Sequence, residues 1–440
     1  MGVKDAFLGK LLASSDKFSD EQVAQTINLL VEHAVKHHAS DIHIEPHDRF
    51  VQVRYRIDNV LRNTHKLPLA ALPAVVKQLK DLAGLKTSED HLPQEGQYAT
   101  LVGDEQFEIQ VYTMPVIGGE KLVLHVSRRL SEPPTLRQLG FWGESLRLLQ
   151  QTLSASHGLI LVATPRRNGK TTTLHSLLQT IATPAISVAT VEEHIEFRLQ
   201  GVSQTVISPR RGISAQSGLQ AALNQDPNVI MLSTIPDRAT AVSVVQAAVG
   251  GHLVLAGMHT DDAVRAIIQL QIMNEEHFLF ANALKAAVSQ RLVRRLCPEC
   301  RIFYAPGRDE IRSTEKAFGI TTATAKTQVH HLEQLAIRAG IGDDTPATTT
   351  GGIINLWRAS DDGCAACNHT GYQGALAVVE VLGVQDNEAE KALLTTVHAD
   401  KLRRAALKDG FIPMELDGLI KALRGQTTLT ELLRVLSVAA

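Results

Sequence analysis

The stretch VATPRRNGKTTTLHSLL, residues 162–178, constrains the fold of this chain more than any other part of it. It begins at the end of the apolar, strand-like run LILV (159–162) and continues as a helix-like segment. Between strand and helix stand Gly169, Lys170 and Thr171. A phosphate-binding loop needs these parts: backbone N–H groups at a helix start surround phosphate oxygens, the lysine reaches the outer phosphates and the threonine hydroxyl holds Mg²⁺. The stretch therefore predicts a P-loop.

The loop departs from the pattern G-x-x-x-x-G-K-[ST] in its first half. Thr164 replaces the opening glycine, and Arg166 and Arg167 stand where compact residues let the backbone approach a ligand. Two alternatives are open for these arginines, because they can contact a nucleotide or fill the pocket themselves. The residues expected to bind nucleotide in the loop are Thr164, Asn168, Gly169, Lys170, Thr171 and Thr172.

Length and charge set broad limits on the protein. A chain of 440 residues should hold about two to four domains. With 44 Lys and Arg against 46 Asp and Glu, bulk charge gives no support to a direct nucleic-acid partner. No apolar run approaches the roughly 20 residues that span a bilayer, and the start lacks a secretory signal. We expect a cytoplasmic protein without a transmembrane segment.

Hydrophobic periodicity divides the chain into two kinds of sheet. A helical pattern over 20–38 precedes strand patterns over 41–46, 50–57, 107–114 and 120–127, which indicates an N-terminal α+β domain. Buried strands over 185–191, 228–233 and 252–258, with helical segments between them, predict a parallel α/β sheet around the P-loop. The Thr/Ala/Gly-rich stretches at 321–327 and 345–352 are interpreted as loop. The tail is expected to be helical, with Thr427 or Thr428 as an N-cap.

The four cysteines form two C-x-x-C pairs, Cys297 with Cys300 and Cys364 with Cys367. Tetrahedral Zn²⁺ takes four soft ligands, and each pair supplies two thiolates from one tight turn. Since all four positions are filled, such a zinc would be structural. The spacing alone leaves unliganded thiols open as the alternative.

Several segments, taken in order along the chain, resemble the type II secretion and type IV pilus assembly ATPases, the extension-motor type of the secretion traffic NTPases. The similarity runs from about residue 25 to 437. The segments are ASDIHIEP (39–46), VRYRID (53–58), PQEGQ (93–97), GEKLVL (119–124), HGLILV with the following GKTTTL helix, NQDPNVIML (224–232), GHLVLAGMHTDDA (251–263), QRLVRRLCPEC (290–300), GCAACNHTGYQG (363–374) and RGQTTLTELLRV (424–435).

The resemblance implies an architecture and a set of partners. It implies hexameric rings, formed by this chain alone or with an active paralogue, and an inner-membrane pilus or secretion platform as partner, with the chain peripheral at that membrane. Pilus assembly, secretion and DNA uptake stay open. The expected parts are a leader over 1–20, an N-terminal α+β domain over 21–130, a linker over 131–140, a RecA-like P-loop domain over 141–290, a tetracysteine zinc module over 291–380 and a helical C-terminal region over 381–440.

The resemblance also implies a damaged catalytic site. The family glutamate that activates water falls on Thr234, which has no carboxylate. The candidate catalytic residues that remain are Glu192 and Glu193 in the acidic segment TVEEHIEF and His259 at the position that senses the terminal phosphate. Losing one positioned general base typically costs about 10²–10⁴ in rate. The sequence therefore identifies no catalytic residue beyond these three candidates.

Family arginines that face nucleotide are missing at most of their positions. Arg54 and Arg56 remain and are expected to contact nucleotide of a neighbouring subunit. A guanidinium has a fixed charge and a bidentate fork that an amide or imidazole does not reproduce. The positions without arginine are His91, Gln97, Gln110, His125, Gln220 and Asn224, together with Pro236 after Thr234.

These changes predict a pseudo-ATPase that keeps the fold, a structural zinc and weak or absent binding of ATP and Mg²⁺, and that acts as a ring component or regulator of an active paralogue. A divergent active motor that uses Glu192 or Glu193 as base is the first alternative. An interaction module that binds no nucleotide is the second.

Overall fold

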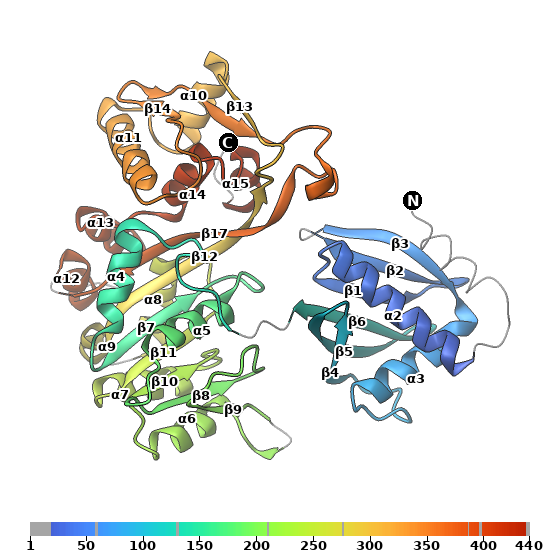
Figure 1. Ribbon diagram of the computed structural model, residues 1–440. Helices are drawn as coiled ribbons and strands as arrows, with labels where there is room; N and C mark the ends of the chain where they lie inside the picture. The colour runs from blue at the N-terminus through green and yellow to red at the C-terminus, as the bar shows by residue number, and fades with distance from the viewer. Residues whose placement is uncertain are drawn as a thin grey trace. The chain divides into compact units, whose positions relative to one another are not determined.

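The computed structural model describes residues 19–57, 60–128, 132–208, 211–274, 277–385, 387–395 and 398–436. Nearly all of the expected leader over 1–20 lies outside these residues. The chain forms two compact units, Met1–Ser131 and Glu132–Ala440. Figure 1 labels the elements of each unit.

The first unit is a six-stranded antiparallel sheet covered on one face by two helices. Helices α2 (Asp20–Lys36) and α3 (Leu72–Leu82), the latter preceded by a 3₁₀ turn over Leu69–Ala71, pack on the same core as the sheet. The helix and strands that the sequence predicted here are confirmed. The strand order is β3 (Val60–Pro68), β2 (Phe50–Ile57), β1 (Asp41–Pro46), β6 (Gly119–Arg128), β5 (Glu105–Val116) and β4 (Gln94–Val102).

Alternation along the strands decides which side chains meet the helices. In β1, Ile42 and Ile44 are fully buried in the core beneath the helices, whereas Asp41 and His43 point to the opposite face. Helix α2 begins at a capping box in which the Ser19 hydroxyl accepts from the next turn. The helices therefore take the apolar face and leave a polar face on the other side of the sheet.

The second unit contains a seven-stranded sheet that is parallel except at one edge. The order is β17 (Tyr372–Gly383), β12 (Leu284–Leu296), β7 (Gly158–Ala163), β11 (Leu253–Met258), β10 (Val229–Leu232), β8 (Val188–Glu192) and β9 (Val202–Val206). Only β17, among these strands, runs antiparallel to its neighbour. Strands β7, β10 and β11 are buried along their whole length, as parallel strands covered on both faces require.

Helices cover both faces of this sheet. Helices α4 (Gly143–Leu153) and α5 (Lys170–Ile181) pack on one face. The other face is covered by α6 (Ala215–Leu223), α7 (Arg238–Val249), α8 (Ala263–Met273), α9 (His277–Ala283), α12 (Glu388–Thr395) and α13 (Ala399–Lys408).

The chain leaves the sheet between β12 and β17, and Figure 1 shows this long pair of strands running from the parallel strands to the excursion. The excursion holds β13 (Ile302–Tyr304), α10 (Arg308–Ala317), α11 (Ala323–Arg338), β14 (Thr348–Thr349), β15 (Gly352–Ile353), β16 (Leu356–Arg358) and a 3₁₀ turn over Ala365–Cys367.

The loop predicted at 321–327 is wrong, because α11 begins within it. The Thr322 side chain accepts a hydrogen bond from Ala325 N and caps the helix. Val329 and Ala336 then lie buried on one face, seven residues apart. The apolar stripe and the cap outweigh the low helix propensity of threonine. Of the second stretch, 345–352, a small part forms the strand pair β14 and β15.

The C-terminal helices α14 (Met414–Leu423) and α15 (Leu429–Leu436) pack against the excursion and against the long strands β12 and β17. The predicted N-cap at Thr428 is confirmed, since its hydroxyl accepts from Glu431 N at 3.2 Å. Asp417 ties the tail to the start of the unit: it accepts from Trp142 Nε1 at 2.7 Å and pairs with Lys421 Nζ at 2.6 Å. No helix in the described part of the chain combines the length and apolarity needed to cross a membrane.

Candidate nucleotide site and cysteine cluster

The P-loop joins β7 to α5 at the carboxyl edge of the parallel strands. Thr164 begins the loop and is fixed by a hydrogen bond from its N–H to Met258 O at 3.1 Å. Gly169 adopts a φ of 80° immediately before the helix, a conformation that favours glycine. Arg167 has a φ of 63°, so an arginine occupies a left-handed position where a compact residue would be less strained.

Lys170 turns inward to the end of β10, which is separated from β7 by β11. Its Nζ donates a hydrogen bond to the Thr234 hydroxyl, and Gly257 lets its side chain pass, since a Cβ there would lie 3.0 Å from Lys170 Cδ. Burial lowers the pKa of Lys170 to about 8, although the charge of Glu193 opposes the shift. A buried ammonium group thus faces a neutral hydroxyl at the position where the family resemblance implies a glutamate.

His259 completes the contacts of Lys170. Its Nδ1 lies 3.2 Å from Thr164 O and its Nε2 lies 3.3 Å from Lys170 Nζ. A carbonyl only accepts, so Nδ1 carries the proton and Nε2 accepts from the lysine. Burial, and next the charge of Lys170, lower the pKa of His259 below its usual 6.5. The imidazole is therefore neutral at pH 7 and is fixed between the loop and the lysine.

The acidic segment after β8 contributes carboxylates with different environments. Glu192 is fully buried, with its carboxylate 2.9 Å from His175 of α5 and accepting hydrogen bonds from Thr190 and Gln204. Glu193 is exposed, and its charge acts on Lys170. Glu196, which sequence reasoning left without a role, accepts from the Thr172 hydroxyl at 3.2 Å. The structure therefore brings Glu193 and Glu196, rather than Glu192, to the open side of the loop.

Asn168 attaches the loop to β12, a strand far away in the sequence. Its side-chain oxygen accepts from Leu292 N at 2.9 Å and its main-chain oxygen accepts from Gln290 Nε2 at 2.7 Å. The same side chain donates to Arg166 O at 3.0 Å. Gln290 was missed as a site residue. It belongs to the segment QRLVRRLCPEC, but an isolated glutamine gives no signal of its position.

Three of the positions that lack a family arginine lie in one row across the first unit. Gln97 pairs with Gln110, Gln110 with His125, His125 with Asp41, and Asp41 with Arg56. Residues directly opposite in neighbouring strands point to the same side, so this row lies on the polar face of the sheet. The three positions that the resemblance assigns to arginine therefore lie side by side on one face of this sheet.

The retained arginines are engaged within the first unit. Arg54 Nη2 lies 2.5 Å from Glu45, and Arg56 Nε lies 2.9 Å from Asp41, which also contacts His125. They belong to a different unit from the P-loop, and their predicted contact with a neighbouring nucleotide stays a prediction.

The four cysteines converge where β12 ends and β17 begins. Their sulfur atoms all lie within 4.8 Å of one another, with Cys297 and Cys364 at 3.7 Å and Cys300 and Cys367 at 3.8 Å. A tetrahedron of sulfurs about 2.3 Å from a metal has edges of roughly 3.8 Å. Cys367 Sγ also accepts from Cys364 N and Gly371 N, both at 3.2 Å, which favours a thiolate. The predicted clustering is confirmed, and its geometry suits a tetrahedral metal ion.

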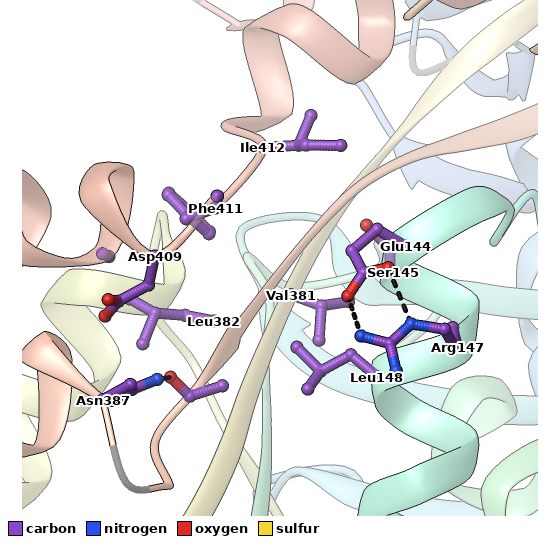
Figure 2. A pocket seen from close by; sticks show the side chains of 13 residues that line it. Glu144, Ser145, Arg147, Leu148, Val381, Leu382, Asn387, Asp409, Phe411 and Ile412 are labelled. Atoms are coloured by element: carbon purple, nitrogen blue, oxygen red, sulfur yellow. Dashed lines mark hydrogen bonds and ion pairs between the residues drawn. The ribbon is translucent and has the colours of Figure 1, made fainter. Parts of the chain in front are cut away.

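A separate cavity of about 190 Å³ lies between α4, the end of β17 and the C-terminal end of α13. Figure 2 shows that its polar side chains bond to the protein itself: Glu144 pairs with Arg147, and Asn387 donates to Gly383 O at 3.0 Å. Asp409 caps the start of α12 by accepting from Ala389 N at 2.9 Å. The cavity contains no residue of the P-loop and is no candidate for the nucleotide.

A parallel sheet with a glycine-lysine-threonine loop between β7 and α5 defines a P-loop NTPase fold. The chain matches the family model of type II/IV secretion system proteins over residues 16–434, and it belongs to that family.

Curated relatives agree with this assignment. The chain is 34% identical to the type IV pilus assembly ATPase PilB of Thermus thermophilus over 415 residues, which are 94% of this chain and 43% of that protein. It is 33% identical to the putative type II secretion system protein E of Escherichia coli over 428 residues, 97% of this chain and 80% of that protein. The chain thus spans less than half of the Thermus protein and most of the Escherichia protein.

A solved structure supports the fold. The Legionella pneumophila ATPase DotB superposes with a TM-score of 0.61 at 16% identity, over 96% of each chain.

Proposed function

We propose that this protein is a pseudo-ATPase of the secretion and pilus assembly family, which binds ATP or ADP weakly and works as a ring component or regulator of an active paralogue. One observation carries the proposal: the P-loop lysine donates to the hydroxyl of Thr234, where the family resemblance implies a catalytic glutamate. Lys170, Thr171 and the backbone of the loop are the groups that would hold the phosphates and Mg²⁺.

The chemistry of phosphoryl transfer explains why this exchange matters. Hydrolysis depends on a positioned water and on positive charge around the phosphoryl group. A threonine is neutral and a poor base, so Thr234 can orient a water but gives it no basic partner. The row of Gln97, Gln110 and His125 lacks the guanidinium groups that would offset phosphate charge. Binding of phosphate therefore survives better than its cleavage.

The test compares Mg²⁺-dependent ATP hydrolysis by the wild-type protein, Lys170→Ala and Thr234→Glu. The proposal expects a wild-type rate near background, insensitive to Lys170→Ala, and a gain of about 10² or more in Thr234→Glu. Robust hydrolysis by the wild-type protein that Lys170→Ala abolishes would overturn it.

A divergent active motor is the second candidate, and the position of Glu193 favours it. Glu193 is exposed and its charge acts on Lys170, whereas Glu192 is buried against His175. In an active enzyme Glu193→Gln would abolish turnover and Glu192→Gln would act mainly on stability. A nucleotide-free module is distinguished by thermal unfolding, since only a binding protein melts at a higher temperature in saturating ADP.

We propose a structural Zn²⁺ in the cluster of Cys297, Cys300, Cys364 and Cys367, because four thiolates fill a tetrahedral shell and leave no open position. We also propose hexameric rings, with this chain alone or with the paralogue, peripheral at the inner membrane on a pilus or secretion platform. These proposals rest on family membership and on the retained fold. Native mass spectrometry of the purified protein measures both the zinc content and the oligomer.

A further inference from the structure

The P-loop is fastened to β12 at the point where β7 stops pairing with that strand. The ladder between the two strands ends at Ser289 opposite Ala163. Beyond it, the edge of β12 would expose unpaired main-chain groups. The side chain of Asn168 accepts from Leu292 N and takes the place of the missing strand.

Gln290 holds both ends of the turn from loop to helix. Its Nε2 donates to Asn168 O at 2.7 Å, and its Oε1 accepts from the Thr173 hydroxyl of α5 at 2.9 Å. The glutamine is 1% exposed and Thr173 is 0% exposed. Both polar atoms of the buried Gln290 amide are hydrogen-bonded, one to the loop and one to the first turn of α5, so the orientation of the amide is fixed.

The hydrogen bond from Gln290 to Asn168 O also fixes the direction of the Gly169 N–H, which belongs to the same peptide group. In a trans peptide the carbonyl and the following N–H point in opposite directions. Because Asn168 O points to Gln290, the N–H of Gly169 points away from β12. The φ of 80° at Gly169 favours glycine, and a Cβ built there would lie 2.8 Å from Gln290 Nε2.

We propose that Gln290 is a positioning residue for phosphate: it holds the Asn168–Gly169 peptide so that the Gly169 N–H is available to a phosphate oxygen of a nucleoside diphosphate or triphosphate. The inference rests on the proposed binding of nucleotide but assigns a role that hydrolysis does not require. Without Gln290 the peptide can rotate and turn a carbonyl, which repels phosphate, to the ligand.

The sequence offers a label for this peptide, since Asn168-Gly169 is the one Asn-Gly pair in the chain. Protein labelled with ¹³C-carbonyl asparagine and ¹⁵N-glycine therefore gives one correlated amide resonance, that of Gly169. Inorganic pyrophosphate and ADP serve as probes, with dissociation constants from calorimetry and the Gly169 resonance recorded in the same titration.

Gln290→Glu is the decisive variant, because it keeps the acceptor for Thr173 and replaces the donor to Asn168 by an oxygen. Ser289→Ala is the matched control: Ser289 is the adjacent residue, is buried, and its hydroxyl has no hydrogen-bond partner among the residues that the structure describes. We expect pyrophosphate to shift the Gly169 resonance in the wild-type protein and the control. In Gln290→Glu we expect no shift and about tenfold or more weaker binding of both probes. Gln290→Met removes the donor without adding charge and gives the same result.

Equal affinities and equal shifts in wild type and both Gln290 variants would overturn the inference and leave nucleotide binding intact. A wild-type protein that binds neither pyrophosphate nor ADP would overturn both the inference and the proposed function. Weaker binding with an unchanged Gly169 shift would also overturn the inference, because the loss would then be a general loss of stability.

Discussion

Replacing Thr234 by glutamate tests the electrostatics of the site directly. Burial lowers the pKa of Lys170 to about 8 in the wild-type protein, where the ammonium group meets the Thr234 hydroxyl instead of a carboxylate. Phosphate binding needs the charged lysine. At pH 9 about one tenth of the lysine is charged, so the affinity for ADP should be about tenfold weaker at pH 9 than at pH 7.

A carboxylate close to the ammonium group changes this pH dependence. An opposite charge within about 4 to 6 Å raises a pKa by roughly 1 to 3. In Thr234→Glu, Lys170 therefore stays charged at pH 9, and the affinity for ADP should change less than about twofold between pH 7 and pH 9. His259 does not interfere, because its pKa lies below 6.5 and it is neutral over this range.

Calorimetric titration with ADP at several pH values between 7 and 9.5 measures the effect. Thr234→Val is the control, since it has nearly the size of threonine and no carboxylate, and its affinity should fall with pH as in the wild type. An affinity that is flat up to pH 9.5 in the wild type, or a midpoint shared by wild type and Thr234→Glu, would refute the reasoning.

Further predictions concern the stability of the second unit. Lys170→Met should raise the free energy of unfolding at pH 7 by up to about 3 kcal/mol, because it removes a buried ammonium group. Between pH 8 and 10.5 the unfolded wild-type chain binds more protons than the folded one, so the wild type gains stability as pH rises. The difference in unfolding free energy between the variant and the wild type, measured by urea titration, should therefore shrink over that range. Burial raises the pKa of Glu380 to about 7, so between pH 4.5 and 7 the folded protein binds more protons at this residue than the unfolded chain does. The free energy of unfolding should therefore fall as pH rises through that window. Comparison of the wild type with Glu380→Gln over pH 5–8 isolates the contribution of Glu380. Asp417→Ala should destabilise by about 3–5 kcal/mol, since it leaves the fully buried Lys421 without its carboxylate partner, and an unchanged melting curve would contradict this. Cys364→Ser should remove bound metal, measured by elemental analysis, and lower the melting temperature to that of chelator-treated wild type.

The sequence predicted the parts of the fold that carry local patterns. The apolar strands around Lys170, the paired cysteines and the alternating strands of the first unit each have a period or a spacing that short stretches reveal. Helix α11 was missed because its first turn is rich in threonine, and the apolar stripe that stabilises it lies further along. Local composition there conflicts with tertiary packing.

The candidate site was predictable only where a motif marks it. Thr234 and His259 were placed by neighbouring segments, and the structure sets both against Lys170. Gln290 lies 122 residues from Asn168 in the chain, so no local pattern could reveal their contact. The burial of Glu192 beneath α5 depends on His175, which reaches it only after the helix packs on the sheet.

The cysteine cluster has a consequence for how this family member can vary. The chain departs from the sheet at Cys300 and returns at Cys364, and the thiolates bring departure and return to one point. The segment between them has both ends held at one point, so lengthening its exposed loops changes little in the parent sheet. A fluorescent reporter inserted among the exposed residues 344–346 should leave the rest of the protein folded as long as the cysteine cluster stays intact.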